Sequence, residues 1–315
     1  MNRPSLGAPV RDMRTGRLHT RVHRSGDGHL WRREVLQDGI PARALPALPA
    51  GTGLAAAELA EDGAYEYRVA GGSSLGHLIW PPTADAAGPA HRETLTPAMM
   101  SAGRALRSLH ALGPVLIDPA PVPPPVTRLA RWLRSADDHA HHRLTAVLGP
   151  ARLRALSAWC DVLAAPAPAH PRTLLHGEPS VGLIIPSPAP AHAVLLTGET
   201  LSHGPAAFDT GWLIGELAEM ARLCGPAHAP SFAALATALL TGYGPLGPDD
   251  ITPLALAAGL RSVVHVADYA AYVGWTDGLD HCIALLPDLV DTSGRAALDA
   301  VAVPLSTAAP EARPV

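Results

Sequence analysis

Side chains able to perform acid–base or metal chemistry follow two short apolar segments between residues 174 and 209. The segment LLHGEPSVGLII contains His176 and Glu178, the segment AVLLTGE ends at Glu199, and Asp209 follows. A carboxylate can accept the proton of an attacking hydroxyl group, and hard cations prefer oxygen ligands. These residues therefore indicate a site for proton transfer or cation binding. The chain contains no Gly-x-Ser-x-Gly elbow, Walker loop or Rossmann fingerprint that would favour another enzyme class.

The elements that must position these residues are a β hairpin and the helices around it. Two apolar runs, LII and AVLL, are joined by a turn rich in Pro and Ser, which predicts a hairpin within residues 173–204. Apolar residues at helical spacing predict helices on both sides of it. We place these near 97–112, 127–136, 143–165, 208–223, 230–241, 253–273 and 277–290.

The N-terminal part has a different texture. Gly26-Asp27-Gly28 separates two strand-like segments and predicts a hairpin over 19–33. Two more strands are expected at 54–59 and 64–70, and a short helix or linker at 41–50. The expected division of the chain is an N-terminal lobe at 1–72 with a loose arm at 1–16, a helical lobe at 73–302 with the embedded hairpin at 173–204, and a disordered tail at 303–315.

Composition limits the possible classes of protein. Apolar residues make up 48% and charged residues 17%, which predicts a globular chain, and the net charge of -4 argues against a nucleic-acid partner. No apolar run reaches the roughly 20 residues of a membrane span. The three cysteines, Cys160, Cys224 and Cys282, match no zinc or disulfide spacing. We expect a cytoplasmic protein with neither a membrane nor a nucleic-acid partner.

The central segments resemble the aminoglycoside phosphotransferase / choline kinase family. LLHGEPSVGLII, AVLLTGE and GPAAFDTGWLIGELAEM follow its pattern of His-Gly-Asp-x-x-x-x-Asn, a strand ending in Asp, and a helix that starts near an Asp. AYEYRVAGGSSLGHLI is similar to its inter-lobe hinge, and GRALRSLHAL to the helix that follows. The resemblance covers roughly residues 55–290. It implies an α+β, bilobal, protein-kinase-like fold with nucleotide bound between the lobes.

The chemical positions of the family are altered in this chain. Glu178 stands where the family has its catalytic Asp, and a displacement of about 1 Å can cost on the order of a hundredfold in rate. The two magnesium ligands fall on Leu183, which offers no oxygen, and on Thr197, a neutral hydroxyl. Glu199 is either an alternative ligand or a solvated hairpin acid. The resemblance thus implies a weakened or lost phosphotransfer site.

Two matching positions are expected to shape the site instead of reacting. Asp209 matches the family's helix-start Asp, so we expect it to accept hydrogen bonds from backbone N–H groups around residues 176–178. His176 should shape the same loop. As a relic at the mouth of the cleft, Glu178 should contribute little to stability. A brace that is kept while metal ligands are lost is the pattern of a pseudokinase.

The chain contains no lysine, and all 24 of its basic residues are arginine. The family expects a strand Lys that neutralises nucleotide phosphates, so that role is vacant. The arginines that could replace it are Arg21, Arg24, Arg32 and Arg33. Arginine and lysine are not interchangeable at tightly packed sites. Gly26-Asp27-Gly28 is either a phosphate-covering loop or a plain hairpin turn.

Two further groups of residues could bind a ligand. One is a surface zinc site or a solvated helix face, made of Asp138, His139, His141 and His142. The other lies in the C-terminal helices, which line the acceptor-substrate pocket of the family. Its candidate substrate-binding residues are Asp268, Tyr272, Trp275 and Asp277. Ordinary packing explains the aromatic residues of this second group equally well.

These observations lead to one favoured function and two rivals. The first is a catalytically degraded member of the family that acts as a binding or scaffold subunit for a protein or peptide. It would have no bound cofactor, and its Mg-ATP binding would be weak or absent. The composition indicates a high-GC bacterium, where similar degenerate proteins occur in the biosynthesis of ribosomal-peptide natural products. The rivals are an enzyme with a non-standard cleft and a small-molecule resistance or sequestration protein. Such an enzyme would be a phosphotransferase using Glu178, or would eliminate or cyclise peptide side chains.

Overall fold

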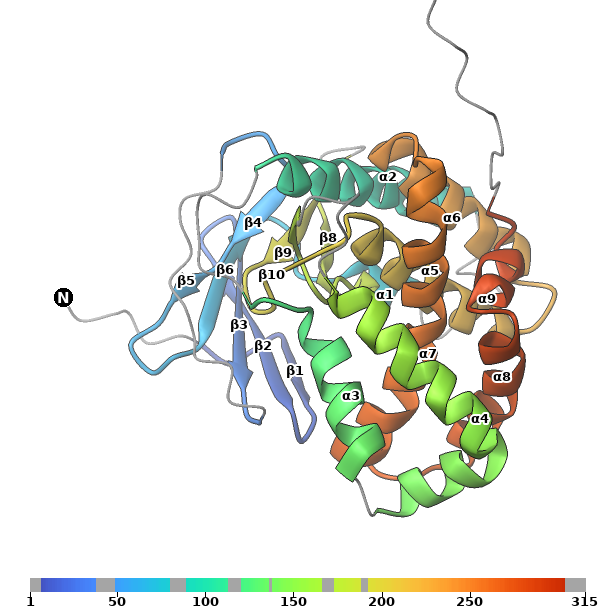
Figure 1. The fold of residues 1–315 in the computed structure, drawn as a ribbon. Helices are drawn as coiled ribbons and strands as arrows, with labels where there is room; N and C mark the ends of the chain where they lie inside the picture. Colours follow the sequence, from blue (N-terminus) through green and yellow to red (C-terminus); the bar gives the residue numbers. More distant parts are fainter. Residues whose placement is uncertain are drawn as a thin grey trace, which may run out of the picture.

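The chain forms two parts, one of strands and one of helices (Figure 1). The computed structural model describes residues 7–37, 49–79, 89–112, 120–135, 138–165, 173–187 and 192–303. The N-terminal strands lie at one side, the helices occupy the other, and short strands from the middle of the chain lie between them. This is the α+β architecture that the sequence predicts.

The N-terminal sheet has the strand order β1-β2-β3-β6-β5 and is antiparallel throughout. Its strands are β1 (Arg11–Arg14), β2 (Leu18–Ser25), β3 (Gly28–Val35), β5 (Glu58–Leu59) and β6 (Tyr65–Val69). The predicted β2–β3 hairpin is confirmed. It turns at Gly26-Asp27, where Gly26 has a φ of 62°, a conformation that glycine adopts without steric cost. Residues 11–14 were expected in a loose arm, but they form β1 because every one of them pairs with β2.

The middle of the chain contributes the short strands β7 (Thr173–Leu175), β8 (Ile184–Pro186), β9 (Ala193–Thr197) and β10 (Ser202–Gly204). β8 and β9 form the predicted antiparallel hairpin. The 3₁₀ turn η3 (Val181–Leu183) precedes β8. β4 (Leu54–Ala56) pairs in parallel with β9 instead of joining the N-terminal sheet. This pairing joins the two parts of the molecule by backbone hydrogen bonds.

The helical part forms one large apolar core. Its helices are α1 (Leu75–Ile79), α2 (Pro89–Ala111), α3 (Pro124–Ser135), α4 (His139–Ala164), α5 (Ala207–Cys224), α6 (Ala229–Tyr243), α7 (Ile251–Tyr272), α8 (Asp277–Asp291) and α9 (Arg295–Ala300). A 3₁₀ turn, η4 (Pro248–Asp250), leads into α7. The sequence did not predict α9, and α2 begins before the predicted residue 97. α4 is kinked at Gly149, which has a φ of 69° and precedes Pro150.

Glycines allow two pairs of helices to cross at close range. A Cβ atom on Gly103 of α2 would lie 2.2 Å from the carbonyl oxygen of Leu239 on α6. One on Gly211 of α5 would lie 2.3 Å from the carbonyl oxygen of Leu254 on α7. Because a side chain cannot approach a carbonyl oxygen so closely, these crossings require glycine.

Within the described residues, no helix combines the length and the apolar character needed to cross a membrane. The expected linker at 41–50 and tail at 303–315 lie almost wholly outside the described residues.

Candidate functional site

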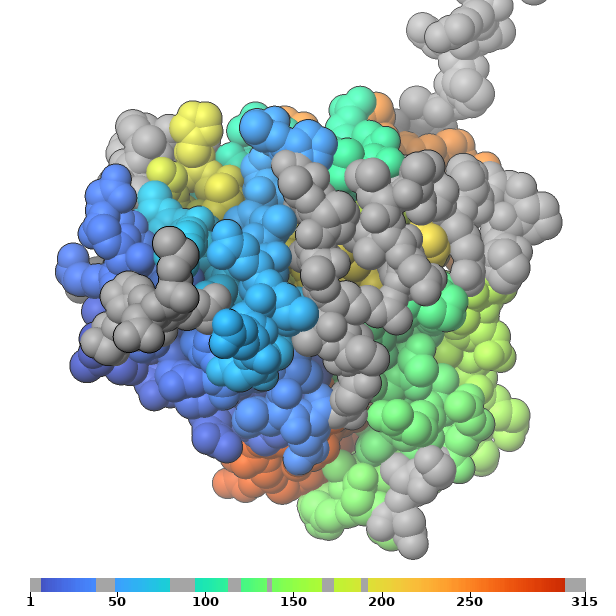
Figure 2. Space-filling view, turned by 90° about the vertical axis from the view of Figure 1, so that its left-hand side faces the viewer, coloured from blue at the N-terminus to red at the C-terminus, as the bar shows by residue number. Residues whose placement is uncertain are grey.

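A cleft of about 550 Å³ lies between the N-terminal sheet and the helical part. One wall comes from the inner faces of β2, β3 and β6. The other comes from the loops that follow β7 and β9. Figure 2 shows the outer side of this arrangement, where the blue N-terminal strands lie against the orange-red C-terminal helices at the lower edge.

Glu178 lies in this cleft, in the loop after β7, and both of its carboxylate oxygens accept hydrogen bonds from arginines. Arg17 donates from Nη1 to Oε1 at 2.9 Å and from Nη2 to Oε2 at 2.8 Å. Arg128 on α3 donates from Nη2 to Oε1 at 2.9 Å and from Nη1 to Oε2 at 3.4 Å. The Glu178 side chain is 17% exposed. It is therefore a half-buried anion enclosed by two guanidinium groups.

Asp268 on α7 completes this group, which we call the arginine–carboxylate cluster: Arg17, Arg128, Glu178 and Asp268. Arg128 Nη2 donates to Asp268 Oδ2 at 2.7 Å, and Arg17 Nη1 donates to the same oxygen at 3.4 Å. The two positive and two negative charges balance. Burial opposes the charged form of Glu178, but Arg128 and Arg17 outweigh it and hold the pKa of Glu178 well below its usual range.

The cluster ties a loop of the N-terminal sheet to the helical part. Arg17 ends the loop between β1 and β2, and the backbone N–H of Gly16 in the same loop donates to the carbonyl oxygen of Tyr272 at 2.8 Å. A Cβ atom on Gly16 would lie 3.1 Å from that oxygen, so glycine suits the close approach. We call the segment Thr15–Arg17 the docked loop, because it is hydrogen-bonded to the C-terminal end of α7.

Asp209 lies in the first turn of α5, is fully buried, and makes the hydrogen bonds that the sequence predicts. Its Oδ2 accepts from the backbone N–H of His176 at 2.7 Å, and its Oδ1 accepts from that of Gly177 at 2.9 Å. Gly177 has a φ of 88°, and a Cβ there would lie 2.0 Å from the carbonyl oxygen of Thr200. A third partner, which was not predicted from the sequence, is His110 on α2, whose Nε2 lies 2.9 Å from Oδ2.

His176 joins the loop to the neighbouring strand. Its Nε2 donates to the backbone carbonyl oxygen of Leu196 on β9 at 2.8 Å, and its side chain is buried. Its Nδ1 has no hydrogen-bond partner among the described residues. The hydrogen bond and the burial of the His176 side chain agree with its expected role in shaping the loop.

Glu199 faces the cleft and is paired, so the interpretation as a solvated hairpin acid is wrong. Its side chain is 11% exposed, and its carboxylate accepts from the Nε and Nη2 atoms of Arg33, the latter at 3.1 Å. The hydroxyl of Tyr67 on β6 donates to Oε1 at 2.9 Å. Burial, and then the charge of Glu199, raise the pKa of Tyr67 well above its ordinary value. The phenol therefore stays protonated and donates to the carboxylate.

Side chains from the sheet donate hydrogen bonds to three successive backbone carbonyl oxygens of the segment that connects β6 to α1. His29 Nδ1 donates to Ala70 at 3.0 Å, the indole N–H of Trp31 donates to Gly71 at 2.9 Å, and Arg11 Nε donates to Gly72 at 3.1 Å. Trp31 is 1% exposed and also lines the cleft. This arrangement was not predicted, although side chains alternate between the two faces of a strand, which places His29, Trp31 and Arg33 on one face of β3.

Only two of the four candidate substrate residues of the C-terminal helices line the same pocket. Asp268 and Tyr272 line a second pocket of about 250 Å³ between α3 and α7. Trp275 packs instead against the ring of His139 and under the guanidinium group of Arg143. Asp277 is exposed in the first turn of α8. Trp275 and Asp277 line neither pocket described here.

The group around Asp138 is a helix cap. The Asp138 carboxylate accepts from the backbone N–H of His141 at 2.8 Å and from the indole N–H of Trp132 at 3.1 Å. Both of its oxygens therefore have a structural use, which favours the solvated-helix interpretation over the zinc site.

Comparisons with known proteins place this geometry in a known fold. No protein-family model matches the sequence, and a search of curated proteins found no match. Among solved structures, a choline/ethanolamine kinase family protein from Mesorhizobium loti is similar, with a TM-score of 0.51 and 18% identity over 94% of this chain and 93% of that chain. The chain has the kinase-like fold.

Two further structures share this fold. Aminoglycoside phosphotransferase APH(4)-Ia has a TM-score of 0.51 and 15% identity, over 93% of this chain and 94% of that chain. Amicoumacin kinase hAmiN, in complex with AMP-PNP, Ca²⁺ and Ami, has a TM-score of 0.56 and 10% identity, over 91% of this chain and 88% of that chain. At such identities the likeness concerns the fold, and residue roles must be argued from the geometry of this chain.

In a kinase-like fold, the loop between the first two strands covers the phosphates and a cation on the third strand pairs with them. In this chain the corresponding loop is the docked loop, not Gly26-Asp27-Gly28, which does not line the cleft. Of the four candidate arginines, Arg33 is the one that lines the cleft. Arg32, on the opposite face of β3, pairs with Glu66 at 2.8 Å.

Leu183 and Thr197, where the family resemblance predicts magnesium ligands, present no side-chain oxygen to the cleft. The side chain of Leu183 is apolar and packs against the core. Thr197 is fully buried, its hydroxyl donates to the carbonyl oxygen of Leu195 at 2.9 Å, and it does not line the cleft. The carboxylates that do reach the cleft, Glu178 and Glu199, are both paired with arginine. The residues at these positions therefore do not fit a kinase-type magnesium site.

Proposed function

We propose that this protein is a kinase-fold binding or scaffold subunit that does not transfer phosphoryl groups. The observation that carries the proposal is the arginine–carboxylate cluster. A catalytic base must accept the proton of a substrate hydroxyl, but both oxygens of Glu178 already accept hydrogen bonds from Arg17 and Arg128. The depressed pKa of Glu178 also makes it a weak base.

The metal positions support the same conclusion. A nucleoside triphosphate carries about four negative charges, which kinases offset with a lysine and with magnesium held by oxygen ligands. This chain has no lysine, and Leu183 and Thr197 supply no ligand in the cleft. Arg33 lines the cleft, but its charge is paired with Glu199. The phosphates would therefore meet neither a lysine nor a free Arg33, and Arg14 lines the cleft only at an exposed position.

The hinge segment adds a second obstacle to nucleotide binding. A flat heterocycle placed between the lobes would need donors or acceptors at the connecting segment. The carbonyl oxygens of Ala70, Gly71 and Gly72 already accept hydrogen bonds from side chains of the sheet. Trp31 in addition brings an indole ring into the same cleft. A nucleotide base that used these carbonyl oxygens would have to share them with the side chains or displace those side chains, and displacement would lower the affinity.

A peptide is the class of partner that suits such a cleft. Its backbone offers hydrogen-bond donors and acceptors without net charge, so it can occupy about 550 Å³ of space in which Arg17, Arg33, Glu178 and Glu199 are already paired. We extend the proposal to a peptide or protein partner in natural-product biosynthesis in a high-GC bacterium. The composition of the chain, with its 24 arginines and no lysine, supports the high-GC bacterium, and the biosynthetic context comes from the family resemblance.

A second candidate function rests on one observation. Arg33 stands on the strand where kinases have their phosphate-binding lysine, and its partner Glu199 reaches the cleft. A phosphate group could displace Glu199 from Arg33, and Glu199 could then hold a divalent cation. The protein would in that case be a phosphotransferase of unusual design.

Isothermal titration of the purified chain with Mg-ATP and with Mg-GTP separates the two functions. For the scaffold we expect dissociation constants at about the millimolar level or no binding, which corresponds to about 4 kcal/mol at most. Micromolar binding that disappears with a chelator and in Glu199→Gln would overturn the scaffold in favour of the unusual phosphotransferase. Asp277→Asn, a change at an exposed acid outside both pockets, is the matched control for the loss of a negative charge.

A further inference from the structure

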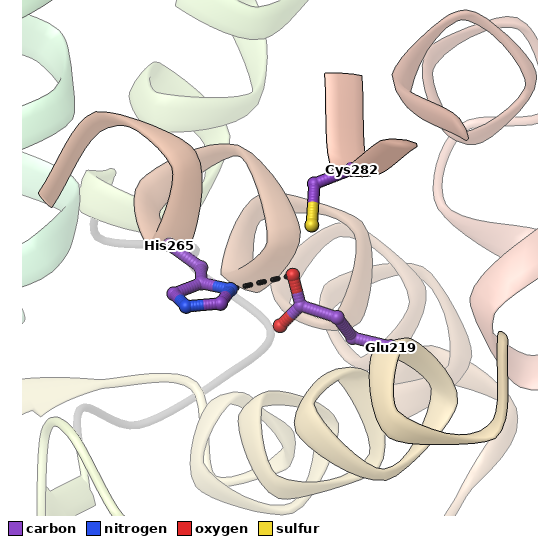
Figure 3. Close-up of side chains that lie close together, drawn as sticks. All are labelled: Glu219, His265 and Cys282. Carbon is purple, nitrogen blue, oxygen red and sulfur yellow. Dashed lines mark hydrogen bonds and ion pairs between the residues drawn. The ribbon is translucent and has the colours of Figure 1, made fainter. Parts of the chain in front are cut away.

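Three metal-binding side chains converge in the helical part, and none of them lines the cleft. Glu219 comes from α5, His265 from α7 and Cys282 from α8 (Figure 3). Their ligand atoms all lie within 4.8 Å of one another, and His265 Nδ1 is 2.6 Å from Glu219 Oε1. In the part of the chain that the structure describes, this is the one group of three such residues found so close together.

The orientation of the three side chains suits a shared cation. Figure 3 shows the sulfur of Cys282 directed toward the Glu219 carboxylate, and the His265 ring facing that carboxylate from another helix. Tetrahedral zinc has bonds of about 2.0–2.3 Å, which places its ligand atoms about 3.5 Å apart. The distance of 2.6 Å between His265 Nδ1 and Glu219 Oε1 is shorter than that value, and no two of the three ligand atoms are more than 4.8 Å apart. Small side-chain movements would therefore bring the three atoms into place.

The donor types select the kind of metal. Thiolate and imidazole are ligands for zinc and similar transition metals, whereas magnesium and calcium prefer oxygen alone. Glu219 and Cys282 are each about 5% exposed, while the His265 side chain is 30% exposed. The site thus has a buried side that holds the ligands and an open side through which an ion and a water molecule can enter.

Negative charge is concentrated beside the cluster. Arg261 lies 3.4 Å from Glu219 and 3.5 Å from Glu216, so this arginine pairs with two buried carboxylates, and the charge of Glu219 also acts on Arg222. A divalent cation bound to the Cys282 thiolate would add one net positive charge. That charge would further stabilise the two buried carboxylates.

We propose that Glu219, His265 and Cys282 bind a zinc-type divalent cation, with water as a fourth ligand on the open side of His265. The ion would join α5, α7 and α8. This site does not depend on the function proposed for the cleft. The sequence could not reveal it, because residues 219, 265 and 282 are far apart in the chain and match no zinc motif.

The rival arrangement is an ion pair between a protonated His265 and Glu219, with Cys282 as a neutral thiol. Burial, and then the charge of Glu219, raise the pKa of the Cys282 thiol to about 11. A bound metal would have to displace the thiol proton, whereas the ion pair leaves it in place. A direct probe of the sulfur therefore distinguishes the two arrangements.

The test is a titration of the untagged chain with Co²⁺ alone, followed by absorption spectroscopy. We expect one equivalent to bind and to produce a thiolate-to-cobalt charge-transfer band, which Zn²⁺ alone then removes by competition. Cys282→Ser should abolish the band and weaken Zn²⁺ binding by more than about a hundredfold. His265→Gln, at a half-exposed position that tolerates substitution, should weaken Zn²⁺ binding comparably while the chain stays folded.

Cys160→Ser is the matched control, because Cys160 is a buried cysteine outside the cluster. It should leave the band and the stoichiometry unchanged. The proposal fails if Zn²⁺ does not bind at one equivalent per chain, or if it binds His265→Gln as tightly as the unchanged protein. A cobalt spectrum without a thiolate band would equally overturn it in favour of the ion pair.

Discussion

At the scale of single residues, Asp209 commits both carboxylate oxygens to the loop that follows β7. It accepts from the backbone N–H groups of His176 and Gly177 and lies beside His110 Nε2. Because Asp209 is fully buried, no water can replace it as an acceptor. Asp209 is therefore a buried brace of the loop that carries Glu178.

Asp209→Ala should be strongly destabilising. It leaves two buried backbone N–H groups unpaired, and each such group costs about 1–3 kcal/mol. We expect the melting temperature to fall by several degrees in a thermal scan. Asp209→Asn keeps one acceptor oxygen and should lose less. If Asp209→Ala melts at the same temperature as the unchanged chain, the brace described here does not exist.

The backbone partners of Asp209 could be predicted, whereas the partners of Glu178 could not. Asp209 matches the helix-start Asp of the family that the chain resembles, so its backbone hydrogen bonds could be predicted from that resemblance. The partners of Glu178 could not, because Arg17 lies 161 residues away and Arg128 lies 50 residues away, with no local pattern to connect them. The expectation that Glu178 contributes little to stability took it for a relic without partners, and it stays a prediction. Without Glu178, Arg17 and Arg128 would lose four hydrogen bonds.

At the scale of elements, the docked loop is the main connection that sequence patterns did not indicate. The hairpins β2–β3 and β8–β9 follow from turn residues and alternating apolar residues, which are local signals. The contact of Thr15–Arg17 with α7 and the pairing of β4 with β9 join distant segments. Such contacts depend on the packing of the whole chain, which local periodicity does not report.

Arg17→Ala should release the docked loop. It removes two hydrogen bonds to Glu178 and one to Asp268, and leaves those carboxylates with Arg128 alone. We expect hydrogen exchange at the Gly16 amide to rise at least tenfold, with little change in the core of α5. Arg14→Ala is the matched control, since Arg14 lines the same cleft, is exposed, and has no ion pair within the described residues. Equal exchange in both variants would show that the cluster does not hold the loop.

Acid provides a second readout of the same prediction. The folded-state pKa of Glu178 lies below its ordinary value of 4.5, so its ionised form stabilises the fold. That stabilisation is complete above pH 4.5 and is lost as the pH falls toward the folded-state pKa. Protection of the Gly16 amide should decline over the same acidic range in the unchanged chain, and in Arg17→Ala it should already be low at neutral pH.

At the scale of the whole molecule, the helical part is held at a fixed spacing by glycines. Gly103 on α2 faces a carbonyl oxygen of α6, and Gly242 on α6 would place a Cβ 2.0 Å from the carbonyl oxygen of Met100 on α2. The contact is reciprocal, so a methyl group on either glycine would collide with the backbone of the other helix. Composition and helical periodicity predicted the helices, whereas the distances between them depend on these individual positions.

Gly103→Ala should therefore destabilise the protein although alanine is the better helix former. The propensity gain is about 1 kcal/mol, but overpacking against backbone costs typically 1–3 kcal/mol or more. We expect a net loss of stability in urea unfolding. Gly278→Ala in α8 is the matched control, because its Cβ would meet nothing closer than 3.6 Å. It should be neutral or stabilising, and a neutral Gly103→Ala would contradict the close crossing.

The strand β1 is fastened at both ends, and this has a consequence for the rate at which the cleft exchanges its contents. Arg11 at its start bonds to the segment that connects the two parts, and the docked loop at its end bonds to α7. A ligand that needs the space occupied by the docked loop, whose residues Thr15 and Arg17 line the cleft, can enter only when the loop detaches. Association is then slower than an open groove would allow, because it waits for a conformational change. A molecule that has entered leaves by the same rare event, so even a modest affinity would be accompanied by a long residence time.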